Sequence, residues 1–385
     1  MKLSPQNESE LADIVRGADG QSFEIVGHGS KRGLGRPVDA SVVLDLSAFS
    51  GIVRYEPDEL VITARAATPV GEIEAVLAEK NQRLGFDPAD WGPFYGMPEK
   101  TATIGGVLSA DSSGSARLRF GAARDHLLGF RAVNGLGEIY KAGGHVVKNV
   151  TGFDVPKLMC GAFGTLGPLT EVTLRLVPRA SGSATLVVRD TDAEAGLALL
   201  RRAWASPLEP SGLAYVPHAL PQCGHIGDGA CLFRVDGAAA PLADKIEALT
   251  NLLGKRDVMR LEDGDDMFSR IGSGGAFADR NGEVWRVFVP PAAAARCARE
   301  LAAPFWLADW AGGVIWAEGG EAEHVHAIAS WCGGYATLMR ASEQIRTDSR
   351  VFSPQTQART ALTKRVKAAF DPHGLFNPGR MYGGI

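Results

Sequence analysis

The residues best suited to chemistry are glycines and small polar residues that gather in three segments of the first half of the chain. The first segment follows a predicted strand at 23–26 and reads Gly27-His28-Gly29-Ser30-Lys31-Arg32-Gly33-Leu34-Gly35. The bare backbone N–H groups of such a loop can surround a phosphate. An ordinary glycine turn is the alternative interpretation of this segment taken alone.

Two common phosphate-binding folds are excluded for this loop. A dinucleotide-binding fold places a helix after the loop, but here Pro37 follows and the next predicted strand already begins at Val42. A P-loop needs a Gly-Lys-Ser/Thr group after a four-residue gap, and this sequence has none there. The order of local elements is therefore a strand, the glycine loop and a second strand.

The second and third segments are also built from small residues. The second runs over 101–114, where Thr103 is a predicted N-cap of a short helix that faces a pyrophosphate; close helix packing through Gly105 and Gly106 is the alternative. The third combines 148–154 with the glycine-rich stretch 161–171. Three such segments in one domain favour a large, extended cofactor over coincidence.

Composition excludes several classes of protein. The 385 residues carry 40 Lys and Arg against 44 Asp and Glu, a net charge of −4, which argues against a general nucleic-acid-binding face. The five cysteines form no CxxC pair, which excludes a disulfide framework, a cysteine-rich zinc site and a Cys₄ iron–sulfur cluster. No apolar run reaches the ~18 residues of a membrane span, and the first residues lack the apolar core of a signal peptide. We therefore expect a cytoplasmic protein that docks at a membrane, if at all, through a partner.

The strands and helices expected around these segments indicate an α+β fold. An N-terminal α+β domain is expected over 1–180, a second, smaller α+β domain over 181–345, and a C-terminal helix and tail over 346–385 that return to the first domain. Thr68 and Pro69 predict the start of a helix, with Thr68 as its N-cap.

The order of these segments resembles the FAD-binding domain of the vanillyl-alcohol oxidase and p-cresol methylhydroxylase (PCMH) superfamily. The motifs that carry the resemblance are the 27–35 loop, Thr103-Ile104-Gly105-Gly106, Arg119-Phe120-Gly121, Lys148-Asn149 with Gly152 and Asp154, Gly164-Thr165-Leu166-Gly167, and the closing Asp371-Pro372-His373-Gly374-Leu375-Phe376-Asn377-Pro378-Gly379-Arg380. The resemblance implies a PCMH-type domain of two α/β subdomains, a cap domain that binds substrate, and FAD as the cofactor. The residues it implies for FAD binding are Gly27, His28, Gly29, Ser30, Lys31, Gly33, Thr103, Ile104, Gly105, Gly106, Ser112, Ser113, Gly114, Arg119, Lys148, Asn149, Gly152, Asp154, Gly164, Thr165, Gly167, Leu169 and Asn377.

Within that superfamily the chain is most similar to the smaller FAD-binding subunit of bacterial glycolate oxidases. The chain length, the run 144–152 and the stretch 285–290 support this. The resemblance implies a complex with a larger FAD-binding subunit and an iron–sulfur subunit. Such a complex oxidises glycolate, and often D-lactate, to the 2-oxo acid and passes electrons toward a quinone.

Single polar residues give weaker evidence about function than the glycine-rich segments do. His28 lies one position too early for the histidine that tethers flavin in some relatives, so we expect non-covalent FAD. His225 lacks the second histidine of a metal-binding stretch, so no metal site is expected. Arg286, in an apolar strand, is a candidate for gripping a substrate carboxylate, although an internal ion pair is the favoured alternative. His373 is a weak candidate for the catalytic base, and the base itself stays unassigned.

Three functions remain open at this point. The chain is an FAD-dependent 2-hydroxyacid dehydrogenase with its own substrate pocket, or an electron-relay or structural subunit that leaves substrate oxidation to its larger partner. An oxidase of the same superfamily that acts on sugars or alcohols is a third, less favoured reading. No second electron carrier is evident in the sequence, so electrons that leave the flavin need an external acceptor.

Overall fold

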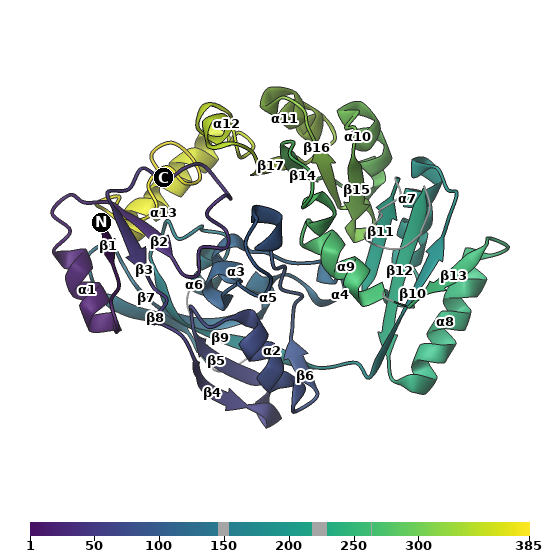
Figure 1. Cartoon of the computed structure of the whole chain (residues 1–385), viewed down its shortest axis with the longest axis horizontal. Coiled ribbons are helices and arrows are strands. Elements are labelled where there is room, and N and C mark those ends of the chain that lie inside the picture. The colour runs from purple at the N-terminus through teal and green to yellow at the C-terminus, as the bar shows by residue number, and fades with distance from the viewer. Residues whose placement is uncertain (145–153, 218–228, 263) are drawn as a thin grey trace. The chain divides into compact units, whose positions relative to one another are not determined.

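The computed structural model describes residues 1–144, 154–217, 229–262 and 264–385, which form two compact units (Figure 1). Unit 1 comprises Met1–Ser113, Gly121–Arg179 and Pro354–Ile385. Unit 2 comprises Gly114–Phe120 and Ala180–Ser353. Within the described residues, no helix is long and apolar enough to cross a membrane.

Unit 1 contains two sheets. A three-stranded parallel sheet, with strand order β1-β3-β2, is formed by Lys2–Leu3 (β1), Phe23–Val26 (β2) and Val42–Asp45 (β3). A six-stranded antiparallel sheet has strand order β4-β5-β9-β7-β8, with β6 also paired to β9. Its strands are Ile52–Glu56 (β4), Val61–Arg65 (β5), Gln82–Leu84 (β6), Leu127–Val133 (β7), Ile139–Gly143 (β8) and Leu169–Pro178 (β9). The two sheets confirm the predicted pair of subdomains.

The helices of unit 1 pack against these sheets. They are Glu8–Arg16 (α1), Val70–Ala78 (α2), Ile104–Ala110 (α3), Ala123–His126 (α5), Val155–Met159 (α6) and Gln357–Phe370 (α13). α1 begins where the Asn7 side chain accepts a hydrogen bond from the Glu10 N–H at 3.0 Å. Ile73 and Leu77 of α2 and Leu108 of α3 lie in one buried apolar cluster with strands of the six-stranded sheet.

The predicted cap of α2 is wrong. Pro69, not Thr68, occupies the N-cap position, and the helix begins at Val70. The Thr68 hydroxyl instead donates to the Arg65 carbonyl at 2.7 Å and accepts from the Gly51 N–H at 2.9 Å. Thr68 therefore ties the end of β5 to the turn before β4 rather than capping the helix.

The C-terminal tail extends the three-stranded sheet. Beyond α13, Phe376 forms a parallel bridge with Phe23, and the Asn377 N–H donates to the Phe23 carbonyl at 2.9 Å. The Phe23 N–H in turn donates to the Leu375 carbonyl at 2.7 Å. Residues more than 340 positions apart thus pair at β2, the strand that leads into the first glycine loop.

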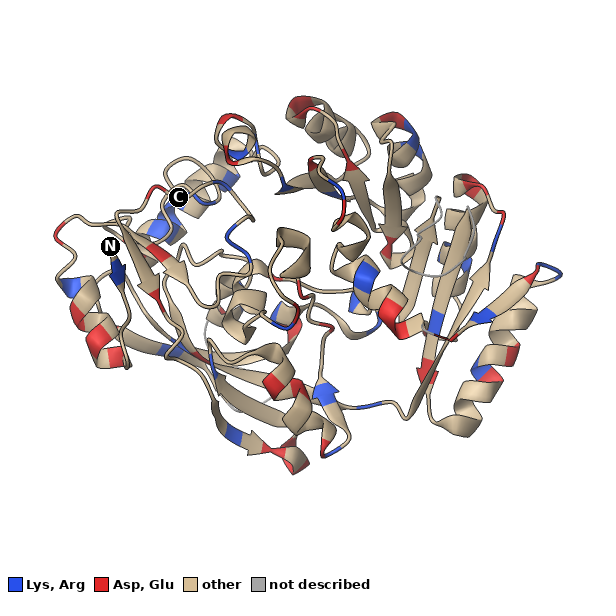
Figure 2. Cartoon of the chain, viewed as in Figure 1, with Lys and Arg blue, Asp and Glu red and all other residues tan. Residues whose placement is uncertain are grey.

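Lys and Arg residues gather along α13, whereas acidic residues predominate on α1 (Figure 2).

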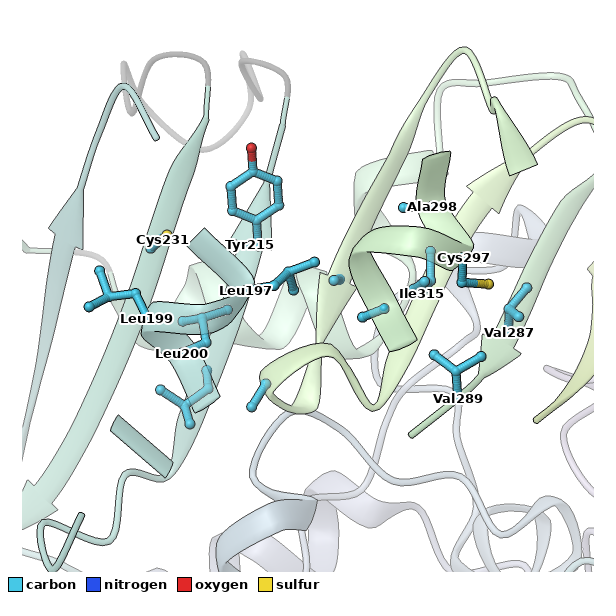
Figure 3. Close-up of a cluster of buried hydrophobic side chains, with 14 of the residues drawn as sticks. Leu197, Leu199, Leu200, Tyr215, Cys231, Val287, Val289, Cys297, Ala298 and Ile315 are labelled. Carbon is cyan, nitrogen blue, oxygen red and sulfur yellow. The ribbon is translucent and has the colours of Figure 1, made fainter. Parts of the chain in front are cut away.

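Unit 2 is built on an eight-stranded antiparallel sheet of order β13-β10-β12-β11-β15-β16-β14-β17. Its strands are Gly182–Val188 (β10), Gly212–Val216 (β11), Ala230–Gly237 (β12), Val258–Leu261 (β13), Val284–Phe288 (β14), Trp306–Asp309 (β15), Val314–Glu318 (β16) and Tyr335–Arg340 (β17). Its helices are Arg117–Phe120 (α4), Ala193–Trp204 (α7), Ala239–Leu253 (α8), Gly264–Gly272 (α9), Ala294–Leu301 (α10), Ala322–Trp331 (α11) and Glu343–Asp348 (α12). Side chains of α7 and α10, Leu197 and Cys297 among them, pack with sheet residues such as Ile315 into a core of its own (Figure 3).

Candidate cofactor-binding site

A hollow of unit 1 lies where β2 ends in the first glycine loop. It encloses about 850 Å³, counting the part open to solvent, which is within the size range of small-molecule sites. Many predicted cofactor-binding residues line this hollow, namely Gly27, His28, Gly29, Ser30, Lys31, Thr103, Gly105, Gly106, Gly164, Gly167, Leu169 and Asn377. The structure thus brings residues of all three glycine-rich segments and the tail to one place.

The second segment reaches the hollow through backbone pairing. The Gly105 N–H donates to the Ala66 carbonyl at 2.7 Å, and the Ile104 N–H donates to the Thr68 carbonyl at 3.0 Å. Thr103 is the N-cap of α3, as predicted, because its hydroxyl accepts from the Gly106 N–H at 3.3 Å. A Cβ on Gly105 would lie 2.7 Å from the Ala66 carbonyl oxygen, so only glycine permits this close approach.

Asn377 joins the tail, β2 and the third segment at the wall of the hollow. Its side-chain oxygen accepts from the Ile25 N–H at 2.8 Å, and its amide nitrogen donates to the Phe163 carbonyl at 2.7 Å. Gly164 has a φ of +72°, and a Cβ there would lie 2.6 Å from the Asn377 amide nitrogen. Asn377 therefore fixes the spacing between β2 and the 161–167 loop.

A buried ion pair holds that tail in place. The Lys367 ammonium donates to the Asp371 carboxylate at 2.6 Å, to the Thr165 carbonyl at 2.7 Å and to the Phe376 carbonyl at 3.0 Å. Asp371 in turn accepts from the N–H groups of Leu375 and Phe376 at 2.9 and 2.8 Å. Burial lowers the pKa of Lys367, while the Asp371 carboxylate acts in the opposite direction.

The charged side chains around the hollow are mainly cationic. Arg32 donates to Glu24 through Nε at 2.9 Å and through a second nitrogen, which raises the pKa of Arg32. The Arg380 guanidinium donates to the Lys31 carbonyl at 2.9 Å. The Lys31 ammonium is buried and has no hydrogen-bond partner among the described residues. An anionic ligand group would complete this site.

Several predicted residues lie elsewhere. Gly33 packs under the Tyr95 ring, and Ile104, Ser112, Ser113 and Thr165 are buried in unit 1 without lining the hollow. Asp154 forms an ion pair with Lys157 at 2.8 Å. Gly114 and Arg119 belong to unit 2, where Gly114 accepts from the Trp310 indole at 3.0 Å and Arg119 pairs with Glu209 at 2.6 Å. Lys148, Asn149, Gly152 and His225 lie outside the described residues.

The two weak catalytic candidates do not line the hollow. Arg286 is buried in β14, and its guanidinium lies over the rings of Phe288, Trp310 and Trp316 at 5.2, 4.8 and 5.1 Å from their centroids. Such stacking stabilises a buried guanidinium. His373 is exposed in the turn after α13. These placements assign neither residue a role in catalysis.

Other lining residues were not named individually from the sequence, although several lie in the three glycine-rich segments. They are Glu24, Ile25, Val26, Arg32, Leu34, Leu46, Ala66, Ala67, Ser109, Ala110, Phe163, Pro168 and Arg380. Most are apolar or small residues that occur throughout any chain, so their types carry no signal. Arg380 stands in the closing motif, and that motif was the one available pointer to it.

Comparison with known proteins decides the family. Residues 2–143 match the family model described as FAD binding domain. Glycolate oxidase subunit GlcE of Escherichia coli (strain K12) is 33% identical over 366 residues, which cover 95% of this chain and 94% of that protein. The chain belongs to the GlcE family. It is accordingly an FAD-linked oxidoreductase, and FAD is its cofactor.

Two further similarities place the GlcE-family chain more broadly. Glycolate oxidase subunit GlcD of Bacillus subtilis (strain 168) is 29% identical over 217 residues, covering 56% of this chain and 44% of that protein. A crystal structure of p-cresol methylhydroxylase with substrate bound superposes with a TM-score of 0.68 at 14% identity, covering 98% of this chain and 88% of that one. The latter confirms the expected PCMH-type fold.

The hollow fits the FAD that the GlcE family implies. FAD combines an anionic diphosphate with a flat, largely apolar ring system. The buried Lys31 ammonium, with no hydrogen-bond partner among the described residues, suits the diphosphate. Small or apolar residues such as Ala66, Ala67 and Leu169 supply close-approach surface for the rest.

Proposed function

We propose that this chain is the smaller FAD-binding subunit of a glycolate oxidase complex. The observation that carries the proposal is its similarity to GlcE, which extends over 95% of the chain and so includes both units. A similarity confined to the FAD-binding domain would support only a shared cofactor. A similarity that also includes unit 2 supports a role shared with GlcE.

In this proposal FAD is held non-covalently in the hollow of unit 1 and supplies two-electron redox chemistry when bound. Gly27, Gly29 and Lys31 bind its diphosphate, and Asn377 keeps the surrounding loops at the right separation. Gly105 and Gly106 admit close approach of the cofactor along α3. Lys148, Asn149 and Gly152, implied by the resemblance, belong to the same proposed set.

The reaction proposed for the assembled complex is oxidation of a 2-hydroxy acid, glycolate or D-lactate, to the 2-oxo acid. Electrons would leave through an iron–sulfur subunit to a quinone, and the larger FAD-binding subunit would be the second partner. The chain would meet the inner face of the membrane through these partners. Since His373, the one candidate for the catalytic base, does not line the hollow, no base is assigned to this chain.

Co-expression tests this proposal. The full chain is purified alone and together with its two presumed partner subunits, and glycolate-dependent reduction of a quinone analogue is measured. We expect the assembly to be active and the isolated chain to be at least tenfold slower. Equal rates for the isolated chain and the assembly would contradict the subunit role.

The second candidate is a self-sufficient 2-hydroxyacid dehydrogenase, favoured by the FAD site that unit 1 forms from its own residues. Anaerobic titration of the isolated chain with glycolate, D-lactate and L-lactate distinguishes the two candidates. Bleaching of the flavin absorbance by one of these acids would establish the second candidate. An unchanged spectrum supports a subunit that depends on its partners for substrate oxidation.

A further inference from the structure

The Lys31 side chain ends in a buried amine at the wall of the hollow. Its Nζ atom is inaccessible to solvent and has no hydrogen-bond partner among the described residues. The amine lies against the first turn of α3, because a Cβ built on Gly106 would be 3.9 Å from it. That same Cβ would be 3.1 Å from the Thr103 hydroxyl, so the amine, the helix cap and the glycine pair share one wall of the hollow.

The charged groups near Lys31 do not neutralise it by direct contact. Asp90 is the carboxylate that acts on the amine, but its two oxygens accept from the N–H groups of Gly92 and Lys100 at 3.0 and 2.7 Å. Glu24, which also lines the hollow, is paired with Arg32, and the Arg380 guanidinium donates to the Lys31 carbonyl. The exposed His28 completes the titratable groups that line the hollow.

Burial without a direct partner destabilises the charged form of an amine. Burial lowers the pKa of Lys31 to about 8, and the Asp90 carboxylate offsets only part of this effect. An anion in the hollow would act in the opposite direction and stabilise the charged form. Without a ligand, the charged Lys31 side chain thus has no hydrogen-bond partner among the described residues, and an anionic ligand would supply one.

We propose that the Lys31 ammonium is the counter-charge of a phosphate group of FAD, and that FAD binding to this chain takes up a proton at the Lys31 amine. The inference rests on the proposed placement of FAD in the hollow of unit 1. The neutral amine accepts one proton from solvent as the phosphate arrives, and no bond to the cofactor forms. FAD affinity is therefore linked to pH through the Lys31 amine.

The direction of the linkage follows from the lowered pKa. Below pH 8 most of the amine is already charged, so binding takes up little proton. Above pH 8 the free form is mainly neutral and the bound form stays charged, so affinity falls by up to about tenfold per pH unit. At pH 8 itself, binding takes up about half a proton.

The test compares the full-length, flavin-free chain with Lys31→Met and with Lys80→Met, an exposed lysine outside the hollow. FAD binding is measured by titration calorimetry at pH 7, 8 and 9 in buffers of different ionisation enthalpy, which gives both affinity and proton uptake. At pH 7 we expect Lys31→Met to bind FAD at least tenfold more weakly and to take up no proton through pH 9. Lys80→Met should match the unsubstituted chain.

Thermal unfolding of the flavin-free proteins distinguishes a binding role from a structural one. Lys31→Met removes a buried charge with no hydrogen-bond partner among the described residues, so the flavin-free variant should unfold at or above the temperature of the unsubstituted chain. Proton uptake below a tenth of a proton at pH 8, or FAD affinity of Lys31→Met within twofold of the unsubstituted chain, would overturn the inference. Absence of any FAD binding by the unsubstituted chain would instead overturn the proposed site.

Discussion

Gly29 shows how a single backbone conformation shapes the proposed cofactor site. It has a φ of +75°, in the left-handed region, and lines the hollow. A Cβ there would meet only Arg32 and Val26 at ordinary contact distances of 3.6 and 3.7 Å. The requirement for glycine is therefore conformational rather than steric.

This distinction predicts the effect of Gly29→Val. We expect FAD affinity to fall at least tenfold, because the loop must leave its left-handed conformation, which costs about 1–2 kcal/mol, and a branched side chain enters the hollow. Gly96→Val is the matched control, since Gly96 has the same φ of +75° but does not line the hollow. FAD fluorescence titration of both variants checks this. Equal affinities for the two would show that the loop does not contact FAD.

His28 leads to a prediction about how the cofactor is attached. Its imidazole is exposed at the loop, one position early for a flavin tether in the related motif. We expect acid precipitation of the purified chain to release all of its FAD into the supernatant, as measured by absorbance. Yellow colour that stays with the precipitated protein would show a covalent bond.

For single residues, the sequence predicts which ones line the site better than it predicts the contacts that require them. Gly105 was predicted to bind the cofactor or to permit close helix packing, whereas a side chain there would first meet the Ala66 backbone at the end of β5. Lys31 and Thr103 were both named, but their shared wall arises from pairing of 102–105 with 66–70, which no local pattern reveals. Ala66 and Ala67 were missed because alanine has no distinctive chemistry.

Among the elements, the segment from α13 to the tail does the most to hold the site. The Lys367–Asp371 pair is buried and bonds to the carbonyl of Thr165 and to the backbone of Phe376, next to Asn377. Removing one partner of a buried pair leaves an uncompensated charge. The tail, the third glycine segment and β2 therefore depend on one ion pair.

We predict that Asp371→Asn lowers the free energy of unfolding by about 3–5 kcal/mol and weakens FAD binding. Asp13→Asn is the matched control, because Asp13 forms an exposed ion pair with Arg16 on α1 and should cost less than about 1 kcal/mol. Urea unfolding followed by circular dichroism measures both. A loss at Asp371 as small as that at Asp13 would show that other contacts hold the tail.

Most strands with a regular pattern and clear turns were predictable, and others were not. β2, at Phe23–Val26, has its predicted bounds, and β3 begins at Val42 as predicted. β15, at Trp306–Asp309, was not predicted, because the turn that ends it already begins at Trp310 and Ala311, with φ of +55° and +54°, before the glycine at 312 is reached. The error at Thr68 has a different origin, since a tertiary contact with Gly51 competes with the capping role.

At the scale of the whole molecule, the two units have separate cores and separate sheets. Unit 1 takes its residues from three stretches of the chain, and every described residue that lines its hollow belongs to unit 1. The FAD site should therefore respond to cofactor as one structure, although β2, α3 and the tail are distant in sequence.

Hydrogen–deuterium exchange of the flavin-free full chain, with and without saturating FAD, tests this central claim most directly. We predict that FAD slows exchange together in 26–34, 103–110 and 163–169, because these segments line one hollow. β10, at Gly182–Val188 in unit 2, serves as the internal reference and should not change. Slower exchange confined to unit 2, with the three segments of unit 1 unaffected, would contradict the placement of FAD.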